Sequence, residues 1–234
     1  MSKQSDIGLN LYEQKNKYYY SGSNPLILKR IKPGATTVLD VGCAEGNLGA
    51  AIRKQGVRVY GLELFPAAAE EAAKKLDHVL CGDIETIDLP YKEQQFDHIT
   101  FGDVLEHLKD PWAVLRKVKP FLKPSGSIVA CIPNVGHVSI IAELLAGNWT
   151  YVEAGLLDQT HYRFFTLNGV KELFRAAGYQ LTDIERIPQS TPVYDHLLHY
   201  LEAVRQTFHL GSAQFPVEAK TFQYVVEAIK GADG

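Results

Sequence analysis

The segment VLDVGCAEGNLG, Val38 to Gly49, decides how the rest of this sequence can fold. An apolar run ends at the acid Asp40, and three glycines follow within ten residues: Gly42, Gly46 and Gly49. Such a run is typical of a buried strand, and the good helix formers that come next are typical of a helix. Glycine tolerates positive φ and leaves room for a ligand against the main chain. The segment therefore predicts a strand, a ligand-binding loop and a helix, in that order.

The same alternation of strand and helix signals continues from residue 25 to about 135. After the first strand we expect further strands over residues 57–64, 78–83, 96–103 and 126–134. Helices are expected between them, over residues 65–77 and 111–123. Later segments predict a helix over 166–178, a strand over 179–187, a helix over about 194–209 and a strand over 221–230. Alternation of this kind is the pattern of an α/β fold with a parallel sheet.

No repeat or linker divides the chain, so we expect one domain over residues 1–234. Two segments lie outside its predicted core: an N-terminal cap over residues 1–25 and an insertion over residues 136–165. The insertion mixes a helix-like stretch with polar and aromatic residues. Its apolar residues would close over a binding site or meet a second subunit in a homodimer: Ile140, Ile141, Leu144, Leu145, Trp149 and Leu156.

Composition excludes several classes of protein. The net charge is −3, and lysine and arginine are scattered, so neither nucleic acid nor an anionic membrane is an expected partner. Three widely spaced cysteines fit no disulfide framework. The first ten residues lack the regions of a signal peptide, and no apolar run reaches the length of a membrane span. We therefore expect a cytoplasmic protein.

The glycine loop is unsuited to a pyrophosphate. Its spacing, Asp-x-Gly-x3-Gly-x2-Gly, differs from the G-x-G-x-x-G of dinucleotide sites, and its carboxylates would repel phosphate but attract a cation. A nicotinamide-dependent sugar oxidoreductase would also need a Tyr-x-x-x-Lys pair, which none of the twelve tyrosines supplies. The loop therefore favours a ligand with a positive charge.

Two further acids end the next two predicted strands. Glu63 follows the loop by about twenty residues, a placement that suits a carboxylate binding both hydroxyls of a ribose. Asp83 could accept an exocyclic amine, with Ile84 offering an apolar surface to a purine. Each acid alone could equally be a solvated loop carboxylate. Together with Asp40 they lie along one edge of the predicted sheet and describe a nucleoside with a cationic tail.

The segments VLDVGCAEGNLG, GLEL, CGDIE and FDHITFGDVLEHL resemble the successive motifs of class I S-adenosylmethionine-dependent methyltransferases. LKPSGSIVACIPN, DQTHYRFFT and TFQYVVEA extend the resemblance over nearly the whole chain. The sequence is most similar to a bacterial branch that includes the ubiquinone-pathway O-methyltransferases and enzymes of sugar and polysaccharide pathways. The resemblance implies a Rossmann-like, doubly wound seven-stranded sheet with its last strand antiparallel and helices on both faces. S-adenosylmethionine would lie across its carboxyl edge.

The resemblance also implies the activity, which is methyl transfer to a small-molecule or glycan-type acceptor, with a hydroxyl oxygen as the expected target. A non-catalytic protein that binds S-adenosylmethionine as a regulator or partner subunit is the alternative. That alternative predicts a degraded loop or missing acids, whereas both are intact here.

The resemblance assigns cofactor binding to these residues: Tyr19, Tyr20, Asp40, Gly42, Cys43, Gly46, Glu63, Leu64, Asp83, Ile84, Gly102 and Asp103. Within this set, Asp40 and the glycine backbone would hold the methionine end, and Gly102 with Asp103 would border the methyl group. Tyr18 and its two neighbours resemble aromatic residues that cover the cofactor, although a tyrosine-rich helix packed on the core would show the same triplet. Cys43 is expected to be a small filler in the loop.

A hydroxyl acceptor must lose a proton, so a general base is useful. His161 lies where the insertion returns to the sheet, beside Asp158, Tyr162 and Arg163, in the polar and aromatic company expected of an acceptor pocket. We expect His161, His107 and Arg163 to take part in catalysis. The alternative for this stretch is a structural loop in which Asp158 caps a turn and Arg163 makes an ion pair.

Two other histidines leave alternatives open. His137 opens the insertion and could instead orient backbone. Asp103, Glu106 and His107 resemble the acid, acid and histidine trio that binds a divalent cation in the ubiquinone-pathway enzymes. Hard divalent ions prefer several oxygen ligands, and no further acid is evident nearby in sequence, so we expect no metal.

Overall fold

The computed structural model describes residues 24–189 and 192–231. The expected cofactor cover at Tyr18, Tyr19 and Tyr20 lies outside these residues. The strands are β1 (Thr37–Val41), β2 (Arg58–Glu63), β3 (His78–Cys81), β4 (Phe96–Gly102), β5 (Leu122–Pro133), β6 (Tyr179–Pro188) and β7 (Thr221–Lys230). The α-helices are α2 (Pro25–Lys29), α3 (Asn47–Arg53), α4 (Pro66–Ala73), α5 (Pro111–Val118), α6 (Val138–Leu145), α7 (Leu167–Ala176), α8 (Asp195–Thr207) and α9 (Phe215–Lys220). A short 3₁₀ turn, η2 (Leu105–His107), follows β4.

All seven of these strands form one sheet, in the order β3-β2-β1-β4-β5-β7-β6. The first five pair in parallel, and β7 runs antiparallel to both β5 and β6. Burial explains the sequence of β1, since four of its five residues are buried. A strand covered on both faces needs a nearly continuous apolar run. The expected fold class is confirmed, including the antiparallel last strand.

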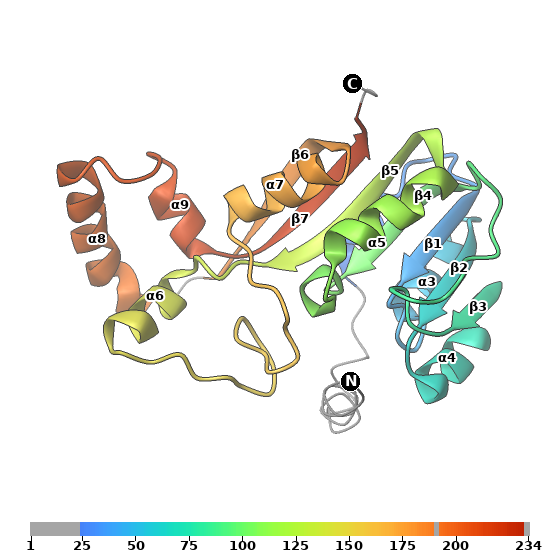
Figure 1. Ribbon diagram of the computed structural model, residues 1–234, viewed down its shortest axis with the longest axis horizontal. Helices are drawn as coiled ribbons and strands as arrows, with labels where there is room; N and C mark the ends of the chain where they lie inside the picture. Colours follow the sequence, from blue (N-terminus) through green and yellow to red (C-terminus); the bar gives the residue numbers. More distant parts are fainter. Residues whose placement is uncertain (1–23, 190–191, 232–234) are drawn as a thin grey trace.

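Helices cover both faces of the sheet (Figure 1). Side chains of α5 and α7, such as Leu115 and Phe174, belong to one apolar core. Side chains of α2, α3 and α4, such as Ile27, Ile52 and Ala72, belong to a second core on the other face. The sheet is therefore packed on both faces by buried side chains. This packing holds in place the edge at which the parallel strands end.

The sequence reading differs from the structure at several elements. The helix expected over residues 111–123 ends at Val118. The strand expected over residues 126–134 begins earlier, because Leu122 pairs with Phe96 ahead of an irregularity in the β4–β5 register. Helix α9 was not expected, since six residues with proline at the second position are too short to show helical periodicity.

The insertion begins with α6 and returns as irregular chain to α7 (Figure 1). Ile140, Leu156 and Leu157 form a small buried cluster within it. The returning chain is tied to η2, because the carbonyl of Glu106 accepts hydrogen bonds from the backbone N–H groups of Tyr162 (2.9 Å) and Arg163 (3.0 Å). The insertion is thus held against the turn that follows β4.

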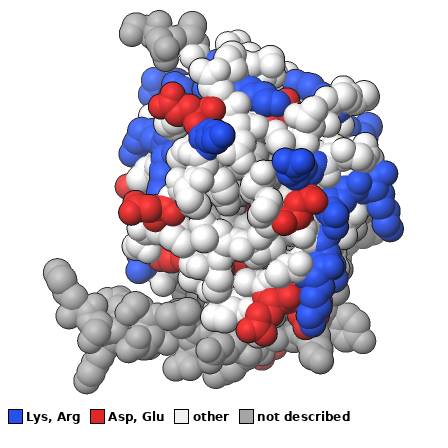
Figure 2. Space-filling view, turned by 90° about the vertical axis from the view of Figure 1, so that its right-hand side faces the viewer, with Lys and Arg blue, Asp and Glu red and all other residues white. Residues whose placement is uncertain are grey.

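Charge is mixed on the face that Figure 2 shows, where acidic and basic side chains are interspersed and separated by uncharged residues. This distribution agrees with the scattered lysines and arginines of the sequence. Among the described residues, no helix combines the length and apolar character that a membrane span requires.

Candidate active site

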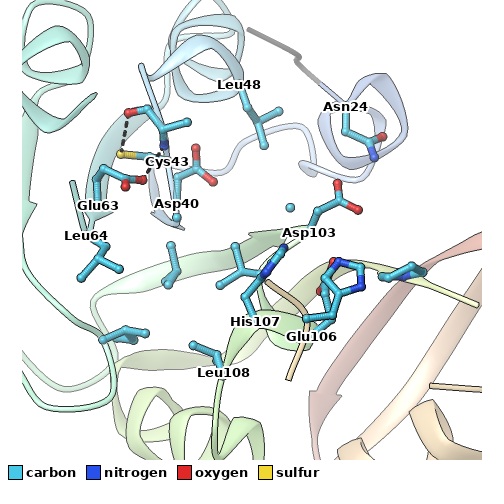
Figure 3. Close-up of a pocket in the computed structure, with 18 of the residues that line it drawn as sticks. Asn24, Asp40, Cys43, Leu48, Glu63, Leu64, Asp103, Glu106, His107 and Leu108 are labelled. Atoms are coloured by element: carbon cyan, nitrogen blue, oxygen red, sulfur yellow. Dashed lines mark hydrogen bonds between the residues drawn. The ribbon is translucent and has the colours of Figure 1, made fainter. Parts of the chain in front are cut away.

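A cavity of about 770 Å³ opens at the carboxyl edge of the sheet. Its walls include residues at the ends of β1, β2 and β4, the first residues of β7, and the returning chain of the insertion (Figure 3). Acids from the strands and histidines from η2 and the insertion therefore share one pocket. Open parallel sheets bind ligands at this edge.

Asp40 lies in β1 and is 2% exposed. Its Oδ1 accepts a hydrogen bond of 2.7 Å from the Thr100 hydroxyl of β4, while Oδ2 has no partner among the described residues. Burial raises the pKa of Asp40 to about 7, helped by the charge of Glu63 and opposed by the Thr100 hydrogen bond. A buried carboxyl with an unpaired oxygen is well suited to a cationic ligand, which would restore the ionised form.

The glycine loop shapes the wall beside Asp40. Gly42 has φ +69° and donates its N–H to the Leu62 carbonyl (2.8 Å), and a side chain at this position would collide with Val104. Gly46 has φ +78° and lies against Ala72 of α4, where a Cβ would come within 3.1 Å of the Ala72 Cα. Gly46 is not among the lining residues, so its position supports a role in the turn rather than direct contact with a ligand.

Cys43 lies in the same loop and is 5% exposed. Burial raises the pKa of its thiol far above the usual range, and the charges of Asp40 and Glu63 add to the effect. The nucleophilic form of cysteine is the thiolate, so this thiol is unreactive near neutral pH. The position of Cys43 agrees with its expected part as a small filler.

Glu63 ends β2 with both carboxylate oxygens turned toward the loop. Oε2 accepts the N–H of Ala44 at 2.8 Å, and Oε1 accepts the N–H of Phe65 at 3.0 Å. Burial raises the pKa of Glu63, and these backbone hydrogen bonds oppose the shift. Each carboxylate oxygen has a second lone pair, so the fixed group can still accept two hydroxyls.

The adenine end of the expected site is formed by residues after β2 and β3. Leu64, Asp83 and Ile84 all line the cavity. Asp83 is oriented by the N–H of Glu85, which donates to its Oδ1 at 2.8 Å. Ile84 is buried and offers the apolar surface that was predicted for a purine.

Gly102 and Asp103, at the end of β4, also line the cavity. Asp103 has φ +55°, and its Oδ1 accepts a hydrogen bond of 2.6 Å from the Gln223 amide of β7. Asp103 is exposed in the cavity, and Gln223 fixes the direction of its carboxylate. The sequence reading missed Gln223. The signal for it was the antiparallel last strand, which begins at the edge where the parallel strands end.

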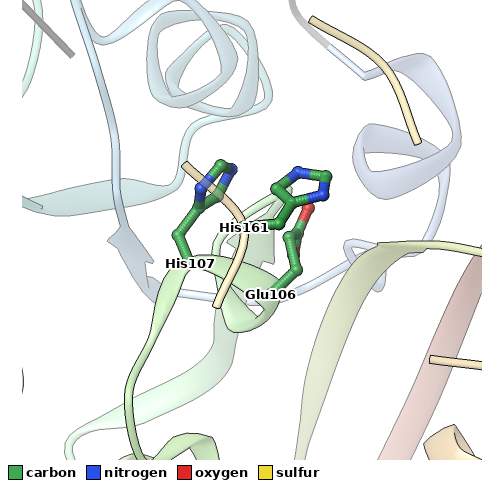
Figure 4. Close-up of side chains that lie close together, drawn as sticks. All are labelled: Glu106, His107 and His161. Carbon is green, nitrogen blue, oxygen red and sulfur yellow. The ribbon is translucent and has the colours of Figure 1, made fainter. Parts of the chain in front are cut away.

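Glu106, His107 and His161 lie close together in the wall of the cavity (Figure 4). One ligand atom from each lies within 4.8 Å of the others, and the two imidazole rings are 4.6 Å apart. Glu106 is 1% exposed, and its Oε2 has no partner among the described residues. Burial raises the pKa of Glu106 well above its usual range, and the charges of Asp103 and Asp158 add to this shift.

The donor set bears on the expected absence of a metal. The three clustered donors are one carboxylate and two imidazoles, whereas Asp103, which the resemblance included, is hydrogen-bonded to Gln223. Magnesium prefers oxygen ligands, so the cluster suits a transition metal better. Any ion would also have to displace the proton that burial favours on Glu106. The metal-free site stays a prediction.

His161 and His107 line the cavity, but two other expected residues do not. The guanidinium of Arg163 donates to the carbonyl of Lys109 and lies over the Trp112 ring, 5.6 Å from its centre. Its position supports a structural part in anchoring the insertion and gives no support to a catalytic one. His137 is buried and caps α6, in agreement with the alternative that it orients backbone.

Comparisons with known proteins also indicate a methyltransferase. A family model described as a methyltransferase domain matches residues 12–184. Ubiquinone biosynthesis O-methyltransferase of Coxiella burnetii is 26% identical over 174 residues, covering 70% of this chain and 74% of that protein. The enzyme of the same name from Xanthomonas axonopodis is 27% identical over 176 residues, covering 69% and 71%.

Solved structures share the fold at lower identity. A methyltransferase of Archaeoglobus fulgidus that depends on S-adenosylmethionine has a TM-score of 0.61 at 18% identity, covering 92% of this chain and all of that one. The [4+2]-cyclase SpnF has a TM-score of 0.60 at 19% identity, covering 89% and 80%. The family match spans well over half of the chain and includes the glycine loop and strands β1 to β5. The chain therefore belongs to the methyltransferase-domain family, within the class I S-adenosylmethionine-dependent methyltransferases.

Proposed function

We propose that this methyltransferase acts on a hydroxyl oxygen of a small-molecule or glycan-type acceptor. The observation that carries the proposal is that one cavity is lined both by acids suited to a sulfonium nucleoside and by histidines suited to a hydroxyl. The relatives named as O-methyltransferases support an oxygen acceptor.

Three carboxylates are proposed to hold the cofactor. Asp40 faces the positively charged end, Glu63 binds the ribose, and Asp83 with Ile84 binds the adenine. When bound, S-adenosylmethionine supplies a methyl group on a sulfonium, and the sulfur keeps the electron pair of the broken carbon–sulfur bond. In-line displacement of this kind depends mainly on position.

His161 is proposed to take the acceptor's proton. Its Nδ1 lies 3.3 Å from the carbonyl of Leu156, a contact in which Nδ1 carries the hydrogen and Nε2 keeps the lone pair. The acceptor oxygen forms its bond to the methyl carbon as its proton passes to Nε2. The side chain of His161 is then an imidazolium, which releases the proton to water.

The insertion is proposed to act as the lid of a single-domain enzyme. Gly155, Asp158 and His161 lie on its returning chain and line the cavity. Other residues of the insertion present large apolar side chains to solvent, among them Leu144, Leu145, Trp149, Tyr151 and Val152. These side chains support the homodimer that the sequence predicts, which light scattering of the purified protein would test.

The test of the proposed function measures release of S-adenosylhomocysteine against a panel of acceptors. The panel should contain catechols, sugar hydroxyls, amines and carboxylates, with cofactor binding followed by titration calorimetry. Turnover with hydroxyl acceptors is expected, together with binding of S-adenosylmethionine and none of NAD. Turnover with amines alone would overturn the oxygen target. Tight binding without turnover on any acceptor class would favour the non-catalytic regulator.

A further inference from the structure

Two residues of the insertion, Asp158 and Thr160, are linked by hydrogen bonds to His107 in the wall of the cavity. The Nδ1 of His107 lies 3.2 Å from the carbonyl oxygen of Thr160 and 3.2 Å from its hydroxyl oxygen. The same hydroxyl donates to Asp158 Oδ1 at 2.7 Å, and the Thr160 N–H donates to that oxygen at 2.8 Å. Asp158 is 1% exposed and Thr160 is 4% exposed, so this chain of contacts is shielded from water.

These contacts determine which nitrogen of His107 carries hydrogen. A carbonyl oxygen can only accept, so the contact with the Thr160 carbonyl requires a hydrogen on Nδ1. The only hydrogen of the Thr160 hydroxyl is engaged with Asp158, which leaves the hydroxyl oxygen as a second acceptor for the same Nδ1–H. In the neutral imidazole the lone pair must then be on Nε2, on the part of the ring directed away from Thr160.

Asp158 has a role beyond those expected for it. The sequence places it near His161 or, as the alternative, at the cap of a turn. In the structure it caps a turn through the Thr160 N–H, its carbonyl accepts the N–H of His161, and its side chain reaches His107 through the Thr160 hydroxyl. It also fixes the Thr160 backbone, because one carboxylate oxygen accepts both the N–H and the hydroxyl of that residue. A buried acid that orients a histidine through its Nδ1 side is a recurring way of directing Nε2 at a reacting hydroxyl.

We propose that Asp158 and Thr160 are positioning residues that hold His107 with its Nε2 lone pair toward the acceptor hydroxyl, beside His161. The proposal rests on the proposed hydroxyl methyl transfer. The tautomer of His107 that the proposal requires can, however, be measured without turnover. Failure of the positioning role and failure of the proposed function are therefore distinguishable.

The first measurement is ¹⁵N NMR of the imidazoles in EDTA-treated protein saturated with S-adenosylhomocysteine. A His107→Gln sample assigns the His107 signals among the eight histidines. The wild type is expected to show the tautomer with hydrogen on Nδ1. Asp158→Asn and Thr160→Val are expected to lower the population of that tautomer, and Thr160→Ser, which keeps the hydroxyl, is expected to restore it. The opposite tautomer in the wild type would overturn the proposal.

The second measurement is steady-state kinetics with whichever hydroxyl acceptor the panel identifies. Asp158→Asn and Thr160→Val should lower kcat by about tenfold to a hundredfold, as is typical when a group that orients a functional histidine is lost. The KM for S-adenosylmethionine should stay within about twofold, because neither residue is in the cofactor half of the cavity. Thr160→Ser should recover most of kcat.

Asp97→Asn is the matched control. Asp97 also accepts from a threonine N–H and hydroxyl, those of Thr36, at 2.8 and 2.9 Å, but it lies at the start of β4, on the opposite edge of the sheet. It should lower thermal stability and leave kcat unchanged. A folded Asp158→Asn variant with no greater loss of kcat than Asp97→Asn would overturn the positioning role, whatever the NMR shows.

Discussion

The half of the pocket that we propose binds the cofactor, the cofactor half, is built from neighbouring parts of the chain. The half that we propose binds the acceptor, the acceptor half, is assembled from distant ones. Ala44 and Glu63, which hydrogen-bond to each other beside the cofactor loop, are 19 positions apart. His107 and Thr160, which contact each other in the acceptor half, are 53 positions apart. The cofactor half therefore depends on the ends of adjacent parallel strands, and the acceptor half depends on how the insertion docks. Substitutions should separate accordingly into effects on cofactor affinity and effects on turnover.

The largest difference between the effect on turnover and the effect on cofactor affinity is expected at His161. His161→Ala should lower kcat by about 10²–10⁴-fold, the range for a general base, and leave S-adenosylmethionine affinity nearly intact. Stopped-time assays of S-adenosylhomocysteine release and calorimetric titration measure the two quantities on one sample.

The other histidines are the controls for that result. His107→Ala should also lower kcat, while His137→Ala, which removes the cap of α6, should act mainly on stability. If His161→Ala keeps most of its turnover and His137→Ala loses it, the acceptor half has been assigned to the wrong histidine. If all three variants remain active, the acceptor loses its proton to water.

A substitution in the cofactor half should instead act mainly on cofactor affinity. Glu63→Ala removes a carboxylate that would accept the ribose hydroxyls, and a hydrogen bond to a charged group contributes about 1.5–3 kcal/mol. S-adenosylmethionine affinity should fall by roughly tenfold to a hundredfold. Asp83→Ala should lose less, because it contacts only the adenine edge. An unchanged dissociation constant in folded Glu63→Ala protein would remove Glu63 from the cofactor site.

Cofactor affinity should also depend on pH through Asp40. The pKa of its carboxyl is about 7 in the pocket, raised mainly by burial, so the group is largely protonated at pH 6. Binding of a sulfonium favours the ionised form, so affinity should rise from pH 6 to pH 8 and change by at most about tenfold per pH unit below 7. Calorimetry across this range tests the sign. Asp40→Asn should flatten the profile, and a profile that falls with rising pH would contradict the assignment.

The smallest effect is expected from removing metal ions. Activity should be unchanged after dialysis against EDTA, because the clustered donors are two imidazoles and a carboxyl whose raised pKa favours its proton. A loss of activity that magnesium, manganese or zinc restores would show that the acceptor half is a metal site. In that case the histidines would act as ligands rather than as bases.

The cofactor half could be predicted from sequence for a physical reason. Parallel strands end at one edge, so acids such as Asp40, Glu63 and Asp83 at three strand ends must come together there. Local patterns contain this information because each of these contacts involves chain segments that are neighbours in the sheet. Local sequence patterns also gave most of the strands and helices, whereas the antiparallel last strand and the helices on both faces were expected from the resemblance to the family.

The acceptor half could not be predicted in the same way. Nothing in the residues around Thr160 indicates that its carbonyl meets His107, because that contact depends on how irregular chain packs after α6. Arg163 has the residue type of a pocket lining, yet it turns outward to Lys109 and Trp112. Glu106 belonged with Asp103 and His107 to the trio that resembles a metal site, whereas the structure groups it with His107 and His161.

The way the insertion is tied down bears on how such an enzyme can evolve. Its returning chain is held by main-chain bonds, from Tyr162 and Arg163 to the carbonyl of Glu106 and from Val135 to the carbonyl of Phe165. Bonds of this kind do not depend on which side chains the segment carries. A pocket-facing position such as Tyr162 can therefore accept mutations without loosening the insertion. Descendants of one gene could change their acceptor in a few steps while inheriting the cofactor site intact.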